Sequence, residues 1–132
     1  MGFCIGLSLE GWLPICIFPR WNFALCAANQ MVNHLDRLPI YSGYRPKVII
    51  RTCAPSRKPF DPGPQHDDDF SWAFRGMFRT IKLVRLMSTD RVVPEYHAAL
   101  ARPISTVLVE QGDLYGAQAP SGVREKLTEA AG

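Results

Sequence analysis

The sequence predicts an α/β fold of three layers, in which helices cover both faces of a mostly parallel sheet. Short apolar runs at residues 15–18, 47–51, 81–86 and 106–109 have the length and the branched side chains of buried strands. Segments with helical spacing or helix-start signals lie between these runs, so strands and helices alternate along the chain. This alternation favours parallel strands, because each parallel pair needs a crossover connection.

The first half of the chain supplies two of these strands and one long helix. Residues 2–9 are expected to form the end of a helix rich in small residues, and residues 11–14 a turn before the first strand. Residues 23–35 are predicted to be an amphipathic helix. Residues 36–44 are interpreted as a connection rich in turns, since proline and glycine interrupt them. The apolar positions of the predicted helix are Leu25, Ala28, Met31, Val32 and Leu35.

The second half contains a long loop, two helices and the last two strands. A loop rich in proline and glycine follows the second strand and leads to a predicted helix over residues 68–78. After the third strand, Thr89 is the expected N-cap of a helix over residues 91–101, and Pro94 fits the first turn of that helix. The fourth strand completes the βα alternation.

The composition is that of an ordinary globular chain and argues against several classes of protein. The 132 residues are 47% hydrophobic and 20% charged, which suits a single domain core. The 15 basic residues are spread among 12 acidic ones and give a net charge of only +3, so no nucleic-acid partner is expected. Glu10, Gly11 and Pro14 interrupt the apolar N-terminal run, so neither a secretory signal nor a membrane span is expected.

The four cysteines lack the spacing of a metal site and lie in apolar surroundings. We therefore expect buried, reduced thiols and no disulfide framework. Reduced thiols are typical of cytosolic proteins, so the expected location is cytoplasmic. The cysteines are Cys4, Cys16, Cys26 and Cys53.

Several short motifs occur in the order and spacing of a known family. They are Asn22-Phe23, Gln-Met-Val-Asn at 30–33, Tyr-Ser-Gly at 41–43, the strand at 47–51, Gly-Pro-Gln-His at 63–66, Leu-Val-Glu at 108–110 and Tyr115-Gly116. With these motifs, residues 2–116 resemble the pyrimidine-binding domain of thiamine diphosphate-dependent enzymes. The resemblance is to the β subunit of 2-oxo acid dehydrogenase E1 components and, more distantly, to the central region of transketolase. It implies a partial pyrimidine-binding domain over residues 1–116 and a tail, or the start of a linker, over residues 117–132.

The resemblance also implies which residues meet the cofactor. Phe23 matches the aromatic side chain that stacks on the aminopyrimidine ring of thiamine diphosphate, and a flat apolar ring suits this role. Pro19 matches another position that lines the ring. His66 matches the active-site histidine that faces the substrate and the carried acyl group, and Gln65 is a site-lining neighbour. A partner subunit or domain would hold the diphosphate and magnesium, so the family implies a homo- or hetero-oligomer and no metal site in this chain.

The residues themselves leave the chemistry of this stretch open. The pKa of a histidine lies near neutrality, so His66 could move a proton or stabilise charge on a carbonyl oxygen; the alternative is a loop histidine satisfied by Asp67 or Asp69. The three aspartates at 67–69 could bind a divalent cation, although such a run is more often a solvated helix N-terminus. Four aromatic residues nearby could form a substrate wall, or could pack in the core or in an interface: Phe70, Trp72, Phe74 and Phe78.

Two functions follow as hypotheses. The first is the pyrimidine-binding half of a thiamine diphosphate-dependent oxidoreductase or transferase, which acts on a 2-oxo acid or a ketose and is inactive alone. In the family, a glutamate upstream of the first helix activates the cofactor. This sequence starts after that position and Glu10 is no substitute, so we expect an N-terminally truncated domain. The second hypothesis is a non-catalytic assembly module that keeps the same fold.

Overall fold

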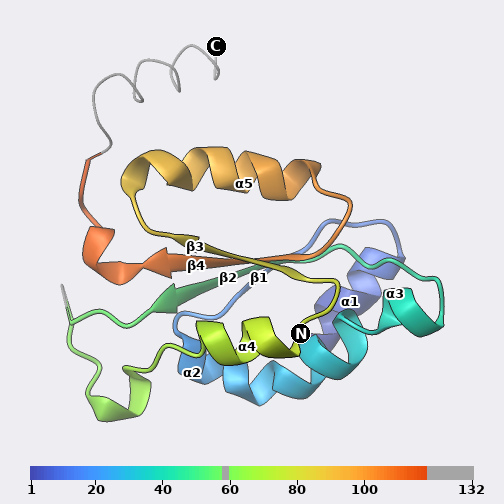
Figure 1. Cartoon of the computed structure of the whole chain (residues 1–132), viewed down its shortest axis with the longest axis horizontal. Helices are drawn as coiled ribbons and strands as arrows, with labels where there is room; N and C mark the ends of the chain where they lie inside the picture. Colours follow the sequence, from blue (N-terminus) through green and yellow to red (C-terminus); the bar gives the residue numbers. More distant parts are fainter. Residues whose placement is uncertain (58–59, 119–132) are drawn as a thin grey trace.

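The computed structural model describes residues 1–57 and 60–118 as a central sheet with helices on both faces (Figure 1). All strand pairs are parallel, and the strands lie in the order β1-β2-β4-β3. The predicted α/β class with a parallel sheet is therefore confirmed. The expected tail lies, from residue 119 onward, outside the described residues. The strands are β1 (Ile15–Ile17), β2 (Ile49–Ala54), β3 (Lys82–Leu86) and β4 (Thr106–Gln111).

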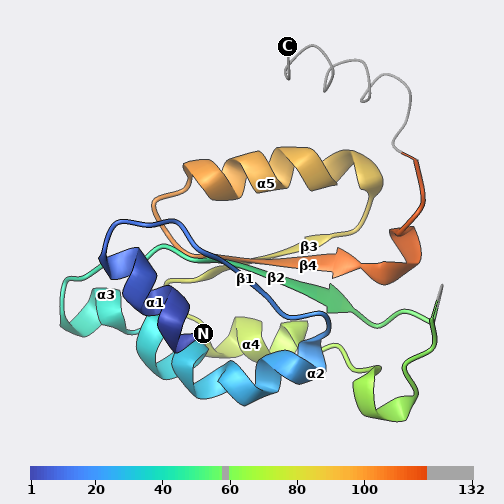
Figure 2. The ribbon, with the colours of Figure 1, turned by 180° about the vertical axis from the view of Figure 1, so that it is seen from behind.

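The helices form the two outer layers of the molecule. Helix α5 (Val92–Ala101) covers one face of the sheet, and the other α-helices lie on the opposite face (Figures 1 and 2). Those four are α1 (Gly2–Leu9), α2 (Trp21–Ala24), α3 (Leu38–Tyr41) and α4 (Ser71–Met77). Short helical turns complete the chain: η1 (Leu25–Ala27), η2 (Gln30–Leu35), η3 (Pro64–His66), η4 (Thr89–Arg91) and η5 (Gly112–Leu114).

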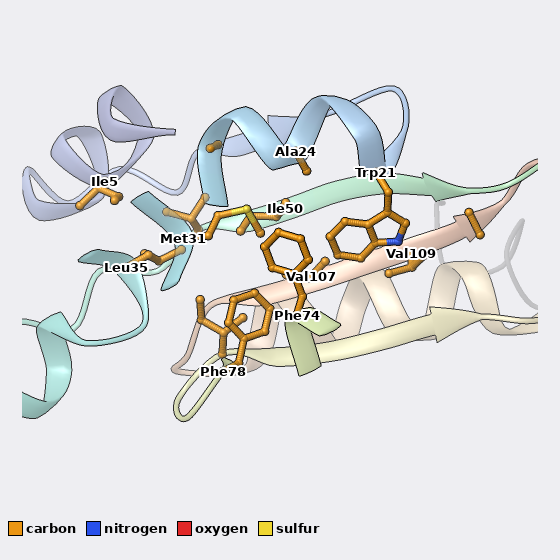
Figure 3. Close-up of a cluster of buried hydrophobic side chains, with 14 residues drawn as sticks. Ile5, Trp21, Ala24, Met31, Leu35, Ile50, Phe74, Phe78, Val107 and Val109 are labelled. Atoms are coloured by element: carbon orange, nitrogen blue, oxygen red, sulfur yellow. The ribbon is translucent and has the colours of Figure 1, made fainter. Parts of the chain in front are cut away.

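The larger hydrophobic core lies between the sheet and the layer that contains α2 and α4 (Figure 3). Trp21 and Phe74 are almost completely buried there, and their rings stack with centroids 4.8 Å apart. Trp21 Nε1 donates a hydrogen bond of 3.1 Å to Ser71 Oγ, which satisfies the buried indole. A smaller core lies under α5 and consists of Ile49, Val84, Leu86, Ala99 and Leu108.

The helix predicted over residues 23–35 is present but begins earlier and is irregular. It starts at Trp21 as α2, tightens into the 3₁₀ turn η1 and widens into the π-helical turn η2. Leu25, predicted to be apolar core, is 45% exposed. The buried face is instead spaced by three and then by four residues, and this spacing fits a tight turn followed by a wide one. Its members are Trp21, Ala24, Ala27, Met31 and Leu35.

Three other local predictions need correction. The connection at 36–44 contains α3, because Pro39 occupies the first turn of that helix, where no backbone donor is needed. Thr89 begins the turn η4, and the N-cap of α5 is Arg91, without a side-chain hydrogen bond. Helix α4 begins at Ser71, so the three aspartates precede it. Of the aromatic residues near α4, Phe74 and Phe78 are buried and Trp72 is exposed.

The cysteines are all free thiols, but they are not all buried. Cys53 is buried, Cys4 and Cys16 are half-buried, and Cys26 is exposed on η1. The expectation of burial is therefore wrong for Cys26, since the core face of this segment is rotated away from it. Within residues 1–57 and 60–118, no helix has the length and apolar character needed to cross a bilayer.

Candidate functional site

The carboxyl ends of β1 and β2 bring the predicted site residues to one edge of the sheet. These strands are parallel neighbours, with Ile17 opposite Arg51, so the connections that follow them leave at the same edge. The connection after β1 leads to α2, and this helix carries Phe23, whose side chain is 43% exposed. The connection after β2 leads to the turn η3, which ends at His66. Ligands of α/β folds commonly bind at this kind of edge.

Phe23 and His66 are in direct contact. Their rings stack with centroids 4.8 Å apart and planes inclined by 19°. The backbone N–H of His66 donates to the carbonyl of Gly63 over 3.2 Å, and Gly63 has a φ of 71°, which glycine adopts without strain. His66 Nδ1 is buried and has no hydrogen-bond partner among the described residues. The stack therefore joins the two residues that the resemblance assigned to cofactor and substrate.

Side chains from the start of α2 hold the loop that carries His66. Arg20 Nη2 donates to the carbonyl oxygens of Ser56 and Phe60, at 3.2 and 3.4 Å. Asn22 Nδ2 donates to Asp68 Oδ2 over 2.9 Å. These contacts fix the loop on both sides of η3 against the segment that bears the aromatic ring.

The two remaining predicted site residues lie on the neighbouring segments of the chain, Pro19 ahead of α2 and Gln65 on η3. Pro19 lines a cavity of about 240 Å³ at the carboxyl ends of β1, β2 and β4, together with Phe18 and Cys53. Burial raises the pKa of the Cys53 thiol, which keeps it protonated near neutral pH. Gln65 is exposed on η3. The structure thus brings Phe23 and His66 together. The roles of Pro19 and Gln65 in the site stay predictions.

The three aspartates after His66 are paired with other side chains. Asp69 Oδ2 lies 2.9 Å from Arg85 Nη2, and Asp69 Oδ1 accepts a hydrogen bond of 2.9 Å from the backbone of Ser71. The aspartates directly precede α4, and Asp69 accepts from the first residue of that helix, in line with the helix-terminus alternative. Among the described residues, no hydrogen bond joins His66 to these carboxylates. No group of three metal-ligating side chains occurs in the described part of the chain. The other two pairs are Asp67 with Arg57 and Asp68 with Asn22.

A second polar cluster lies on the face of the sheet that α5 covers. Arg51 Nε and Nη2 donate to the two oxygens of Glu110, each over 2.7 Å. Tyr96 and Tyr115 donate their hydroxyl groups to the same carboxylate, at 2.8 and 2.5 Å. Burial alone would raise the pKa of Glu110, but the hydrogen bonds from Arg51, Tyr115 and Tyr96 outweigh it and hold the pKa below its ordinary value.

This cluster was missed in the sequence, although a signal existed. Arg51 and Glu110 are charges of opposite sign within two strands that are otherwise uncharged, and β2 and β4 are neighbours in the sheet. The cluster borders a mostly apolar cavity of about 330 Å³ between the start of α5 and η5. Since all the acceptor sites of the carboxylate are engaged, the cluster joins elements and offers no free base.

Comparison with known proteins finds relatives of one kind, and no family model matches the chain. Three of them are the mitochondrial pyruvate dehydrogenase E1 component subunit beta of Chaetomium thermophilum, Caenorhabditis elegans and Saccharomyces cerevisiae. The identities are 28%, 29% and 29%, over 90%, 92% and 87% of this chain. The matches cover 31%, 34% and 31% of the relatives. The chain therefore spans about a third of the length of the curated relatives that it matches.

These relatives confirm the resemblance to E1 β subunits of 2-oxo acid dehydrogenases. They contradict the cytoplasmic location expected from the cysteines, because each is named as a mitochondrial protein. Free thiols indicate a reducing compartment, but they do not distinguish one such compartment from another.

Proposed function

We propose that the chain is the pyrimidine-binding part of a thiamine diphosphate-dependent 2-oxo acid dehydrogenase of the E1 β type. The observation that carries this proposal is the stacked pair of Phe23 and His66 at the carboxyl edge of a parallel sheet. The homology to E1 β subunits supports it over most of the chain. A partner subunit that holds the diphosphate and magnesium is part of the proposal.

Two unpartnered acceptor atoms on the segments that bear Phe23 and His66 support a ligand with an amino group. Asn22 Oδ1 and Asp67 Oδ1 are buried acceptors without a partner among the described residues. An amino group on a flat ring supplies the N–H donors that these oxygens lack. Phe23 supplies the apolar face for the ring, and Pro19 and Gln65 would line its surroundings.

His66 is the proposed acid–base group of the site. When bound, thiamine diphosphate supplies a nucleophilic carbanion and an electron sink for cleavage beside a carbonyl group. The imidazole would donate a hydrogen bond or a proton to the carbonyl oxygen of the 2-oxo acid, a role that histidine often has in general acid–base catalysis. The low polarity of the neighbouring Phe23 ring would strengthen such a hydrogen bond by excluding water.

The alternative is a non-catalytic assembly module, and one observation favours it. The outer edge of β1 is unpaired among the described residues, and its apolar side chains are exposed. Ile15 and Ile17 of β1 are 51% and 57% exposed, and Trp12, which precedes the strand, is 69% exposed. Such an edge suits pairing or packing with further protein. A chain that assembles with its partner and lacks all cofactor affinity would support this alternative.

Substitution of Phe23 tests the cofactor site. In the complex of the chain with its diphosphate-binding partner, Phe23→Ala should weaken thiamine diphosphate binding by about 1–2 kcal/mol, because the ring stack is lost. Isothermal titration calorimetry measures this change. Trp72→Ala, which removes an exposed aromatic side chain on α4, is the matched control and should leave the affinity unchanged. Equal affinities of wild type and Phe23→Ala would contradict the proposed site.

Substitution of His66 tests the catalytic role. His66→Ala in the same complex should lower turnover of the 2-oxo acid by roughly 10²- to 10⁴-fold, the usual contribution of a general acid–base group. Cofactor binding should persist, since Phe23 is intact. Trp72→Ala is again the control and should leave turnover unchanged. A turnover that His66→Ala leaves unchanged would remove His66 from the chemistry.

A further inference from the structure

We propose that His66 is a displaceable plug: its imidazole occupies the ring site on Phe23, and the flat ring of the ligand takes its place on binding. This inference rests on the function proposed above. The observation behind it is that Phe23 already has a nearly parallel aromatic partner at stacking distance, namely His66. An imidazole is itself a small flat heteroaromatic ring, so it mimics part of the ligand it would give way to.

Two unpartnered polar atoms lie on the segments that bear the stacked rings. Asp67 directly follows His66, and Asn22 directly precedes Phe23 and donates to Asp68; Asp67 Oδ1 and Asn22 Oδ1 are both buried acceptors without a partner among the described residues. An aminopyrimidine that replaces the imidazole would bring an amino group, which is the kind of donor that such acceptors lack.

The plugged arrangement is only weakly held. The ring stack is a modest attraction, and the buried Nδ1 of His66 works against it because a buried polar atom without a partner is destabilising. The only hydrogen bond of His66 in the described residues is a local one, from its backbone to Gly63. Release of the imidazole therefore costs little, and it lets Nδ1 find a partner.

The loop is built so that His66 can move while its surroundings stay in place. Arg20 holds Ser56 and Phe60 ahead of η3, and Asn22 holds Asp68 after it. Between these anchors, η3 follows Gly63, whose positive φ lies where glycine alone is unstrained. Rotation of the His66 side chain would move the imidazole away from Phe23 while the hydrogen bonds of Arg20 and Asn22 to the loop stay in place.

The test uses thiamine as the probe, because it carries the aminopyrimidine ring without the diphosphate. In the full chain, His66→Ala should bind thiamine roughly 2- to 10-fold more tightly than wild type, since no plug competes for the ring. His66→Phe keeps a flat side chain on Phe23 and should bind no better than wild type. Trp72→Ala, which removes an exposed aromatic side chain on α4, should match wild type, and circular dichroism checks that every variant is folded.

Nuclear magnetic resonance gives a second readout on unaltered protein. The ring protons of His66 should be shifted upfield by Phe23 in the free chain and should lose this shift when thiamine saturates the site. Binding by wild type with the upfield shift retained, or equal affinity of wild type and His66→Ala, would overturn the plug and leave the ring site standing. No thiamine binding by wild type or by His66→Ala would overturn the ring site itself, and the plug with it.

Discussion

Asp36 illustrates how a single buried side chain fixes a distant turn. The residue is fully buried at the end of η2, and its carboxylate accepts hydrogen bonds from the backbone N–H groups of Arg79, Thr80 and Ile81 at 2.8–3.0 Å. These bonds join the first long helical segment to the entry of β3. In the sequence, Asp36 only marks the start of a turn-rich connection, because nothing in its spacing indicates which backbone groups it would meet.

Removal of this carboxylate should destabilise the fold. Asp36→Ala leaves three backbone donors of a partly buried turn without their acceptor, so the free energy of unfolding should fall by about 3 kcal/mol or more. Urea denaturation followed by circular dichroism measures the change. Asp90→Ala, at an exposed aspartate of η4, is the control and should stay within about 0.5 kcal/mol of wild type. A loss below about 1 kcal/mol at Asp36 would mean that water replaces the carboxylate.

At the scale of the elements, the Arg51–Glu110 pair joins β2 to β4, and Tyr96 adds α5 to the same carboxylate. Each strand was predictable as an apolar run, but the charges that link the strands were not assigned to each other. The reason is topological: β2 and β4 pair in the sheet although β3 lies between them in the sequence. A charge in an apolar strand thus identifies a partner only when the strand order is known.

The pair should make stability depend on pH in the acid range. Because the pKa of Glu110 in the folded chain is lowered, its contribution is present above the ordinary carboxyl pKa of about 4.3 and is lost as the pH falls through the lower folded value. Wild type should therefore lose stability below about pH 4. Glu110→Gln should be less stable at pH 7, by about 1–3 kcal/mol given the partly exposed Arg51, but lose less on acidification.

Denaturation curves at pH 7 and about pH 3.5 decide this point. The same pH dependence as wild type would be expected of the control variant, but in Glu110→Gln it would contradict the proposed role of this carboxylate. Asp90→Asn, at an exposed aspartate of η4, is the expected neutral case. Parallel loss of stability in wild type and Glu110→Gln would show that other carboxylates control acid unfolding.

At the scale of the whole molecule, the pattern of strands and helices was sufficient to predict three layers and a parallel sheet. It was not sufficient for the strand order, nor for the rotation of the helical segment from Trp21 to Leu35, where 3₁₀ and π turns replace a regular helix. The site was predicted from the family resemblance and not from periodicity. Phe23 and His66 do meet in space, and their roles stay predictions.

The thiols offer a test of burial across the molecule. Cys26 is exposed and should react with iodoacetamide within minutes at neutral pH, whereas burial raises the pKa of Cys53 and, with help from Cys4, that of Cys16, and should slow both. Mass spectrometry of the labelled peptides measures the order. Cys26→Ser should remove the fast phase only. Rapid labelling of Cys53 in folded protein would contradict the packing between β2 and η5.

The position of β4 in the sheet affects how the chain folds during synthesis. The last strand of the described residues, β4, lies between β2 and β3, and it pairs with both of them along most of their length. Until residue 111 has left the ribosome, β2 and β3 have no shared neighbour, and their facing edges stay open. The pair of β1 and β2 can form earlier, but β3 joins them only through β4, so a chaperone or early partner would have most to protect just before β4 emerges.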